Sequence, residues 1–265
     1  MDKEIIKVEN LWFRYDSSWV LKDISLSIDE GEFVGIVGPT GSGKTTLVKH
    51  FNGLLKPTKG RVLINGYDTR KHKASFISRF VGYVSQNPDH QIFSQTVYEE
   101  LAFGPKNFGI KDVERRVREV AKLFKLTGKL NSSPFSMSMG EKELLAIASI
   151  LSFDPKVIIL DEPTIGQDFV SYLELVKLLK KLNQRGKTII LISHNVDMLA
   201  ECTNKIVAIL NGRKLFEGST DVFFEKKSVL KKLELPVPHK MKLVKTLRFK
   251  ERLLDLDEIL EWFRE

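Results

Sequence analysis

The sequence predicts an α/β fold in which a mostly parallel sheet carries helices on its faces. Short, apolar, β-branched segments such as KVIILDEP and KTIILISH suit strands that are buried on both faces of a parallel sheet. The helical segment SYLELVKLLKKLNQRG lies between these two strands, and a strand–helix–strand order implies a right-handed crossover. Near the N-terminus, ISLSID alternates apolar and polar residues, which indicates an antiparallel strand with one buried face.

The first 35 residues are therefore expected to form antiparallel strands, with EFVGIVG as a buried strand that runs into a glycine-rich turn. RVLINGYD and IVAILNGRKLFEG each contain Asn-Gly, a pair that favours the tight turn of a hairpin. The second segment predicts a hairpin near residues 206–217. RFVGYVSQ is a further candidate for a buried parallel strand.

Residues 96–152 are mostly helical in pattern and interrupt the order of the strands, which predicts an inserted helical lobe at about 87–155. We expect the later helix SYLELVKLLKKLNQRG to begin at a Ser171 cap and to end at Gly186. The main domain is then residues 1–217.

After about residue 218 the pattern changes to basic helices broken by Pro236 and Pro238, and we predict a C-terminal helical region at 218–265. Residues 226–252 hold ten Lys or Arg against two Glu, a net charge of +8 that equals that of the whole chain. Two readings stay open: solvated helix faces, or a surface near anionic lipid or an acidic partner.

The composition of the chain limits the classes of protein to which it can belong. The 265 residues are 42% hydrophobic, enough for a sizeable core. The opening MDKEIIKVEN lacks the apolar region of a signal peptide, and the longest apolar runs fall far short of the roughly 20 residues that span a bilayer. A single cysteine, Cys202, excludes an internal disulfide and fits a reducing compartment. No aromatic–basic platform or reader motif points to nucleic acid.

Residues 38–46 read GPTGSGKTT and match the phosphate-loop pattern G-x-x-x-x-G-K-[ST] between a predicted strand and a predicted helix. Glycines let the backbone wrap an anion, and the helix N-terminus points its N–H groups at the phosphates. Lys44 is expected to reach the β- and γ-phosphates, and the Thr45 hydroxyl to ligate Mg²⁺. The residues expected to contact the nucleotide phosphates are Gly38, Pro39, Thr40, Gly41, Ser42, Gly43, Lys44, Thr45 and Thr46.

A second acidic element follows the strand VIIL, which delivers Asp161 to the carboxyl edge of the sheet, where ligands bind in open α/β folds. Asp161 suits the Mg²⁺ shell through water, and the adjacent Glu162 could orient or deprotonate an attacking water. Such an Asp-Glu pair alone is often only a turn, but after a phosphate loop it indicates catalysis.

With these motifs the chain resembles the ATPase subunits of ABC transporters over roughly residues 5–217. The resemblance implies a P-loop NTPase fold with a RecA-like mixed sheet, and ATP with Mg²⁺ as ligands. It also assigns roles to four more residues: Tyr15 stacks on adenine, Gln86 joins Mg²⁺ and the attacking water to the helical lobe, Asp168 ends the loop after the catalytic Glu162, and His194 senses the γ-phosphate. The catalytic set that it implies is Glu162, His194, Gln86 and Lys44.

In this family the sequence before the inserted helix is typically LSGGQ, and it binds the γ-phosphate of ATP held by the opposite subunit. Here MSMGE stands in its place, with Ser138 and Gly140 kept. Met139 adds bulk where the backbone must approach a phosphate, and Glu141 places a negative charge near it. Because the groups on the chain's own side of the site are complete, we expect an asymmetric heterodimer in which the partner's ATP faces the weaker signature. A homodimer that tolerates Met139 is the alternative.

The stretch QNPDHQIFSQTVYEELAFGPKNFG resembles the energy-coupling factor (ECF) ATPases and their relatives in cobalt and nickel uptake. The residues that fit their pattern are Gln86, Asn87, Pro88, Gln91, Phe93, Thr96, Val97, Ala102, Phe103, Gly104 and Asn107. The resemblance implies a second ATPase subunit, a transmembrane coupling protein and a membrane substrate-binding subunit as partners. It also implies a peripheral place on the cytoplasmic face of the membrane and uptake of a vitamin or metal ion. Another class of ABC importer, or a regulatory subunit impaired in hydrolysis, stays open.

Overall fold

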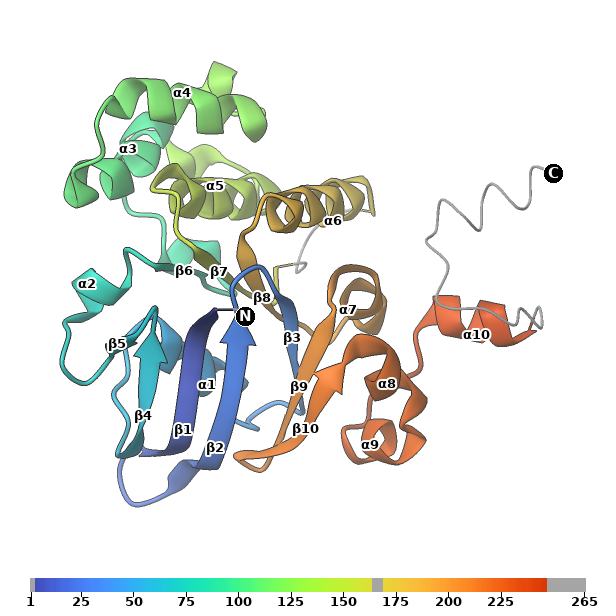
Figure 1. Cartoon of the computed structure of the whole chain (residues 1–265). Coiled ribbons are helices and arrows are strands. Elements are labelled where there is room, and N and C mark those ends of the chain that lie inside the picture. The colour runs from blue at the N-terminus through green and yellow to red at the C-terminus, as the bar shows by residue number, and fades with distance from the viewer. Residues whose placement is uncertain (1–2, 164–168, 247–265) are drawn as a thin grey trace.

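The computed structural model describes residues 3–163 and 169–246, and every structural statement below concerns these residues. Its strands form two sheets, and the helices cover or separate them (Figure 1). The α/β fold class with a mixed sheet is confirmed. No helix of the described residues is long and apolar enough to cross a membrane.

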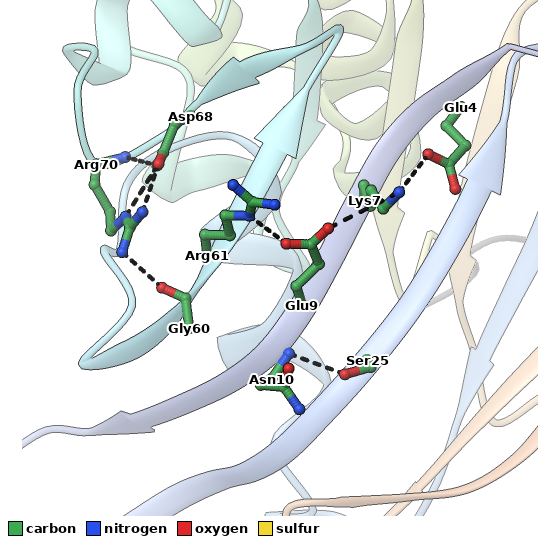
Figure 2. A network of polar contacts seen from close by, with 9 residues as sticks. All are labelled: Glu4, Lys7, Glu9, Asn10, Ser25, Gly60, Arg61, Asp68 and Arg70. Atoms are coloured by element: carbon green, nitrogen blue, oxygen red, sulfur yellow. Dashed lines mark hydrogen bonds and ion pairs between the residues drawn. The ribbon is translucent and has the colours of Figure 1, made fainter.

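The smaller sheet is antiparallel and has the order β2-β1-β4-β5. Its strands are β1 (Glu4–Arg14), β2 (Trp19–Asp29), β4 (Lys59–Ile64) and β5 (Tyr67–Asp68). In β2 the apolar residues Ile24, Leu26 and Ile28 alternate with polar ones, as the sequence predicts, because one face of the sheet packs on the core. The other face carries the polar network of Figure 2, in which Lys7 lies 3.1 Å from Glu4, and Glu9 pairs with Arg61. These pairs are solvent-exposed and add little to stability.

The larger sheet has the order β10-β9-β3-β8-β7-β6 and is parallel except for the edge strand β10. Its strands are β3 (Phe33–Val37), β6 (Val81–Val84), β7 (Val157–Asp161), β8 (Thr188–Ile192), β9 (Lys205–Leu210) and β10 (Arg213–Ser219). Every residue of β3, β7 and β8 is buried, which explains why these segments are uniformly apolar. Parallel strands end at one edge, so the residues after β3, β7 and β8 are brought together.

Both predicted Asn-Gly turns are present. Asn65 and Gly66 join β4 to β5, and Asn211 and Gly212 join β9 to β10, with positive φ at all four residues. That backbone matches the twist of a two-residue hairpin, and Asn and Gly tolerate it best.

Helix α1 (Lys44–Phe51) packs between the two sheets. Leu47, Val48 and Phe51 are completely buried in one cluster with residues of both sheets, including Ile24 and Ile36. The helix that begins at the phosphate loop is therefore fixed by the core itself.

Three α-helices of the described residues lie between β6 and β7, where the sequence predicts a helical lobe, and they are called the helical insertion here; they lie together at one end of the molecule (Figure 1). They are α3 (Val97–Phe108), α4 (Val113–Leu123) and α5 (Met139–Ser152). The short helix α2 (Ala74–Ile77) precedes β6. Leu101, Val117 and Leu145 of these helices are completely buried, in an apolar cluster that also includes Leu160 and Leu191 of the large sheet.

Helix α6 (Phe169–Gln184) crosses from β7 to β8 and corrects one expectation. It begins two residues before Ser171, so Ser171 lies in its first turn and is not the cap. Gly186 ends the helix as predicted, with φ +86° and an N–H bonded to the Asn183 carbonyl at 2.8 Å.

The remaining helices follow β8 and the β9–β10 hairpin. They are α7 (Val196–Cys202), α8 (Thr220–Glu225), α9 (Lys227–Lys232) and α10 (His239–Thr246). Pro236 and Pro238 lie between α9 and α10, where the sequence places a break. The sequence LLDLDEILEWF also predicts an apolar helix face, either for a contact with a second ATPase subunit or for packing on the chain's own domain. Its residues Ile259, Leu260, Trp262 and Phe263 lie outside the described residues.

Candidate functional site

The loop between β3 and α1 has a backbone that requires glycine. Gly38, Gly41 and Gly43 have φ of +150°, +77° and +104°. A Cβ on Gly38 would lie 2.1 Å from the Ile209 carbonyl oxygen, so a side chain cannot be fitted there. The β9–β10 turn holds the loop from the other side, because the Gly212 N–H donates to the Ser42 carbonyl at 3.1 Å.

Lys44 lies inside this loop and is only 8% exposed. Its Nζ donates to the carbonyl oxygens of Gly38 at 2.7 Å and Pro39 at 3.1 Å. Burial lowers the pKa of Lys44, and the carboxylates of Glu162 and Asp161 act in the opposite direction. The loop thus encloses an ammonium group beside a helix N-terminus, an arrangement that suits a phosphate.

Asp161 ends β7 and is 5% exposed. One of its oxygens, Oδ2, accepts from the Thr45 hydroxyl at 2.9 Å and from the Tyr83 hydroxyl at 2.9 Å. Burial, with the adjacent Asp161 charge, raises the pKa of Tyr83, so this hydroxyl stays a donor. A hydroxyl and a carboxylate in contact are oxygen donors of the kind that Mg²⁺ binds, and the pair fits that ion.

Glu162 has a left-handed backbone, with φ +52°, and its N–H donates to the Ile192 carbonyl at 2.9 Å. That turn aims the carboxylate at His194: the His194 N–H donates to Oε2 at 3.2 Å, and His194 Nε2 lies 3.3 Å from Oε1. Burial raises the pKa of Glu162, while His194 and Lys44 lower it. A mostly buried carboxylate beside an imidazole can accept a proton from a water.

The structure thus brings Lys44, Thr45, Asp161, Glu162 and His194 together at the carboxyl edge of the large sheet. The other predicted residues of this site are Tyr15, Gln86 and Asp168. Tyr15 is 59% exposed, and its ring stands edge-on to Phe13 at 4.9 Å. Gln86 is exposed and follows β6. Asp168 lies outside the described residues.

The off-pattern stretch Met137–Glu141 forms the start of α5, and Ser138 is its N-cap. The Glu141 N–H donates to Ser138 Oγ at 3.4 Å, and Glu141 Oε2 accepts from the Ser138 N–H at 3.1 Å, a capping box. Met137 is buried, Met139 is 41% exposed, and a Cβ on Gly140 would meet no atom within 4 Å. The Met139 side chain is therefore partly exposed to solvent at the start of α5.

Two residues were missed by the sequence reasoning. Tyr83 contacts Asp161 only because β6 pairs with β7, with Tyr83 opposite Ile159. Lys129 forms an ion pair with Glu141, and no spacing rule in the sequence connects the two. The capping box itself had a signal, since Ser138-x-x-Glu141 is the pattern for one.

Known sequences similar to this chain are ABC transporter ATP-binding proteins. The family model described as ABC transporter matches residues 21–165. The energy-coupling factor transporter ATP-binding protein EcfA of Methanocaldococcus jannaschii is 42% identical over 254 residues, 94% of this chain and 91% of that protein. A putative ABC transporter ATP-binding protein of Pyrococcus furiosus is 43% identical over 249 residues, 93% of this chain and 95% of that protein.

Solved structures of ATP-binding subunits and cassettes are also similar to this chain. The structure of cbiO1 from Clostridium perfringens, part of the ABC transporter complex cbiONQ, aligns with a TM-score of 0.77 at 33% identity, over 92% of this chain and 100% of that one. A dimeric ATP-binding cassette in a post-hydrolysis state, bound to ADP and Pi, aligns with a TM-score of 0.73 at 28% identity, over 81% of this chain and 98% of that one.

Proposed function

Because this chain belongs to the ABC transporter family of ATP-binding proteins and is an ATP hydrolase of that family, we propose that it powers an energy-coupling-factor-type importer. The observation that carries the proposed hydrolysis is that Lys44, Thr45, Asp161, Glu162 and His194 lie together at one sheet edge. Thr45 and Asp161 form a metal-binding pair, and Glu162 lies against His194. The similarity to EcfA over 94% of the chain and to cbiO1 supports the importer class.

The site suggests how hydrolysis proceeds. Lys44 and the α1 N-terminus bind the β- and γ-phosphates of ATP, and Tyr15 offers an exposed ring for adenine. Thr45, and Asp161 through water, would hold Mg²⁺, which would supply positive charge to neutralise the phosphates. Glu162 orients a water whose oxygen attacks the γ-phosphorus while the bond to the bridging oxygen of ADP breaks.

The raised pKa of Glu162 makes it a better proton acceptor than an exposed carboxylate. It takes the proton of the attacking water, and His194 beside it holds the carboxylate and faces the γ-phosphate. Gln86 is the proposed link from this site to the helical insertion.

The proposed membrane partner is a transmembrane coupling protein, which would release a vitamin or transition-metal ion from a separate substrate-binding subunit. The helical insertion offers a place for it: an open cavity of about 890 Å³ whose lining is mainly apolar. Its aromatic lining residues are Phe76, Tyr83, Phe93, Phe103, Phe108 and Phe153. Phe93 and Phe103 are about half exposed and touch each other at 4.7 Å, which leaves a surface for an apolar helix. The chain would then be peripheral, on the cytoplasmic face of the membrane.

The proposed dimer pairs this chain with a second ABC ATPase subunit. Its own ATP would face the regular signature of that partner, and the partner's ATP would face Ser138, Met139, Gly140 and Glu141. The exposed Met139 would hold a phosphate away from the α5 N-terminus, so we expect slow turnover there.

The test is the solution mass of the Glu162→Gln chain with and without Mg-ATP. This variant keeps the phosphate loop and loses the proton acceptor, so it should bind ATP without turnover. We expect it to stay at its 30.3 kDa monomer mass alone and to pair with the ATPase subunit that copurifies with the native chain. A mass that doubles with ATP alone would favour a homodimer, and an ATP-binding chain that pairs with neither would contradict the proposal.

A further inference from the structure

An ion pair lies at the start of α5, within the off-pattern signature. Lys129, the last residue of a short 3-10 turn (Thr127–Lys129), places its Nζ against Oε1 of Glu141. The other oxygen, Oε2, accepts from the N–H of Ser138 at 3.1 Å and from its hydroxyl at 3.2 Å. Every oxygen of this carboxylate is therefore bonded to the protein.

The pair changes the electrostatics of the signature. The hydrogen bond from Lys129 is the main reason that the pKa of Glu141 lies below its usual range, so Glu141 is ionised at neutral pH. An ionised Glu141 alone would repel a polyphosphate near the α5 N-terminus. Beside Lys129 the two charges sum to zero, and the helix N-terminus keeps its partial positive charge.

Within the described part of the chain, the two lysines that flank Lys129 and Glu141 most closely have other partners. Lys125, one turn earlier, pairs with Glu174 at 2.7 Å, and Lys142, the next residue after Glu141, pairs with Asp89 at 2.8 Å. Lys129 is thus the cation assigned to Glu141.

We propose that Lys129 is a positioning residue of the signature: it keeps Glu141 in the capping box and cancels its charge, so that the α5 N-terminus can receive the triphosphate held by a second ATPase subunit. This inference rests on the proposed function. It also shifts the cause of the weak signature from the charge of Glu141 to two other features. These are the bulk of Met139 and the engagement of the Ser138 hydroxyl with Glu141.

The experiment measures ATP-dependent association by sedimentation in the Glu162→Gln background, on the dimer that this chain forms with the copurifying ATPase or with itself. Lys129→Ala leaves the charge of Glu141 without a cation beside it and should weaken ATP-dependent association about tenfold. Lys129→Arg keeps the positive charge and should restore the association. In chains that also carry Glu141→Gln, the same Lys129→Ala change should have an effect of less than about twofold. Lys125→Ala removes an equal charge from an exposed pair and should leave association unchanged.

Equal losses from Lys129→Ala in the Glu141 and Glu141→Gln chains would overturn the inference, since Lys129 would then act through structure alone. So would an unchanged affinity. Measuring the ATP affinity of the chain before it dimerises distinguishes a failure of this inference from a failure of the proposed function. A chain that dimerises with no dependence on Lys129 contradicts only this inference, while one that binds ATP and never dimerises contradicts the proposed function and with it the site on which Lys129 acts.

Discussion

Asp161 and its two hydroxyl donors show how much of the site depends on single residues. Thr45 and Tyr83 share one carboxylate oxygen, each at 2.9 Å. Thr45 comes from the phosphate-loop helix and was predicted, whereas Tyr83 comes from the neighbouring strand and was not. Residues that orient a ligand of a metal typically change metal affinity by about 10–100-fold when they are removed.

Tyr83→Phe should therefore raise the Mg²⁺ concentration required for half-maximal ATP hydrolysis by about tenfold, since Asp161 loses one of its two donors. ATPase assays over a series of Mg²⁺ concentrations would measure it. Tyr67→Phe is the matched control, because Tyr67 is partly exposed on β5, where its ring packs against Phe76 and makes no contact with Asp161 in the described residues. The same Mg²⁺ dependence in Tyr83→Phe and the parent would mean that Tyr83 does not orient Asp161.

His50 gives a prediction for stability. It is completely buried, its Nδ1 lies 2.8 Å from the Thr46 carbonyl, and burial lowers its pKa from 6.5 to about 4. The folded protein resists protonation here more than the unfolded chain does. The contribution of neutral His50 to the free energy of unfolding is therefore complete above pH 6.5. It is lost as the pH falls towards 4, which lowers the free energy of unfolding by about 3 kcal/mol in total.

His50→Leu should flatten the dependence of the unfolding free energy on pH between 6.5 and 4, whatever its effect at neutral pH. Urea unfolding at several pH values would show this as a smaller slope. Leu54→Ala, at an exposed residue without an ionisable group, is the control and should keep the parent's slope. An unchanged slope in His50→Leu would assign the acid sensitivity to other groups.

At the scale of elements, the helical insertion depends on a contact between α4 and the end of α5. Arg116 on α4 donates from Nε to the Ser152 carbonyl at 2.9 Å and from Nη2 to the Leu151 carbonyl at 2.8 Å. The last carbonyls of a helix have no partner within the helix, so this arginine satisfies two of them. It thereby fixes the far end of the helix that begins with the signature.

Arg116→Ala should lower the unfolding free energy by about 1–3 kcal/mol, the usual cost of losing hydrogen bonds to a charged donor. Arg118→Ala is the matched control, because Arg118 is on the same helix but pairs with Glu114 on the surface. Its effect should stay within about 0.5 kcal/mol. Thermal and urea unfolding of both variants would compare them, and similar losses would mean that the α5 end is capped by other means.

Elements with local signals were predictable, and those that depend on neighbours were not. The Asn-Gly turns and the buried strands follow from local backbone preference and from burial on both faces. The start of α6 did not follow, because Ser171 is a good cap by type but the helix begins at Phe169. Lys129 contacts Glu141 across the turns that separate α4 from α5, and no sequence pattern predicts that contact.

At the scale of the whole molecule, the same distinction holds for the sheet and the site. Strand–helix–strand order predicts parallel strands but not the order β10-β9-β3-β8-β7-β6. That order places β3 beside β8 and β8 beside β7, which brings Lys44, Glu162 and His194 to one edge. The phosphate-loop and Asp-Glu motifs predicted Lys44 and Glu162, and the resemblance to ABC ATPases implied His194, while the hydrogen bond between Glu162 and His194 required the fold.

The last prediction follows from the proposed asymmetry of the dimer. In the complex purified through a tag on this chain, Glu162→Gln should lower ATP turnover roughly 100-fold, because this chain's ATP faces a regular signature and turns over quickly. The corresponding Glu→Gln change in the copurifying ATPase should lower turnover by less than about twofold, since its ATP faces the Met139 signature and contributes little. Each complex should still bind ATP, which a filter assay would check. Equal losses from the two substitutions would mean that the exposed Met139 and the bonded Ser138 hydroxyl do not hinder the trans site, and the two halves of the motor would then be equivalent.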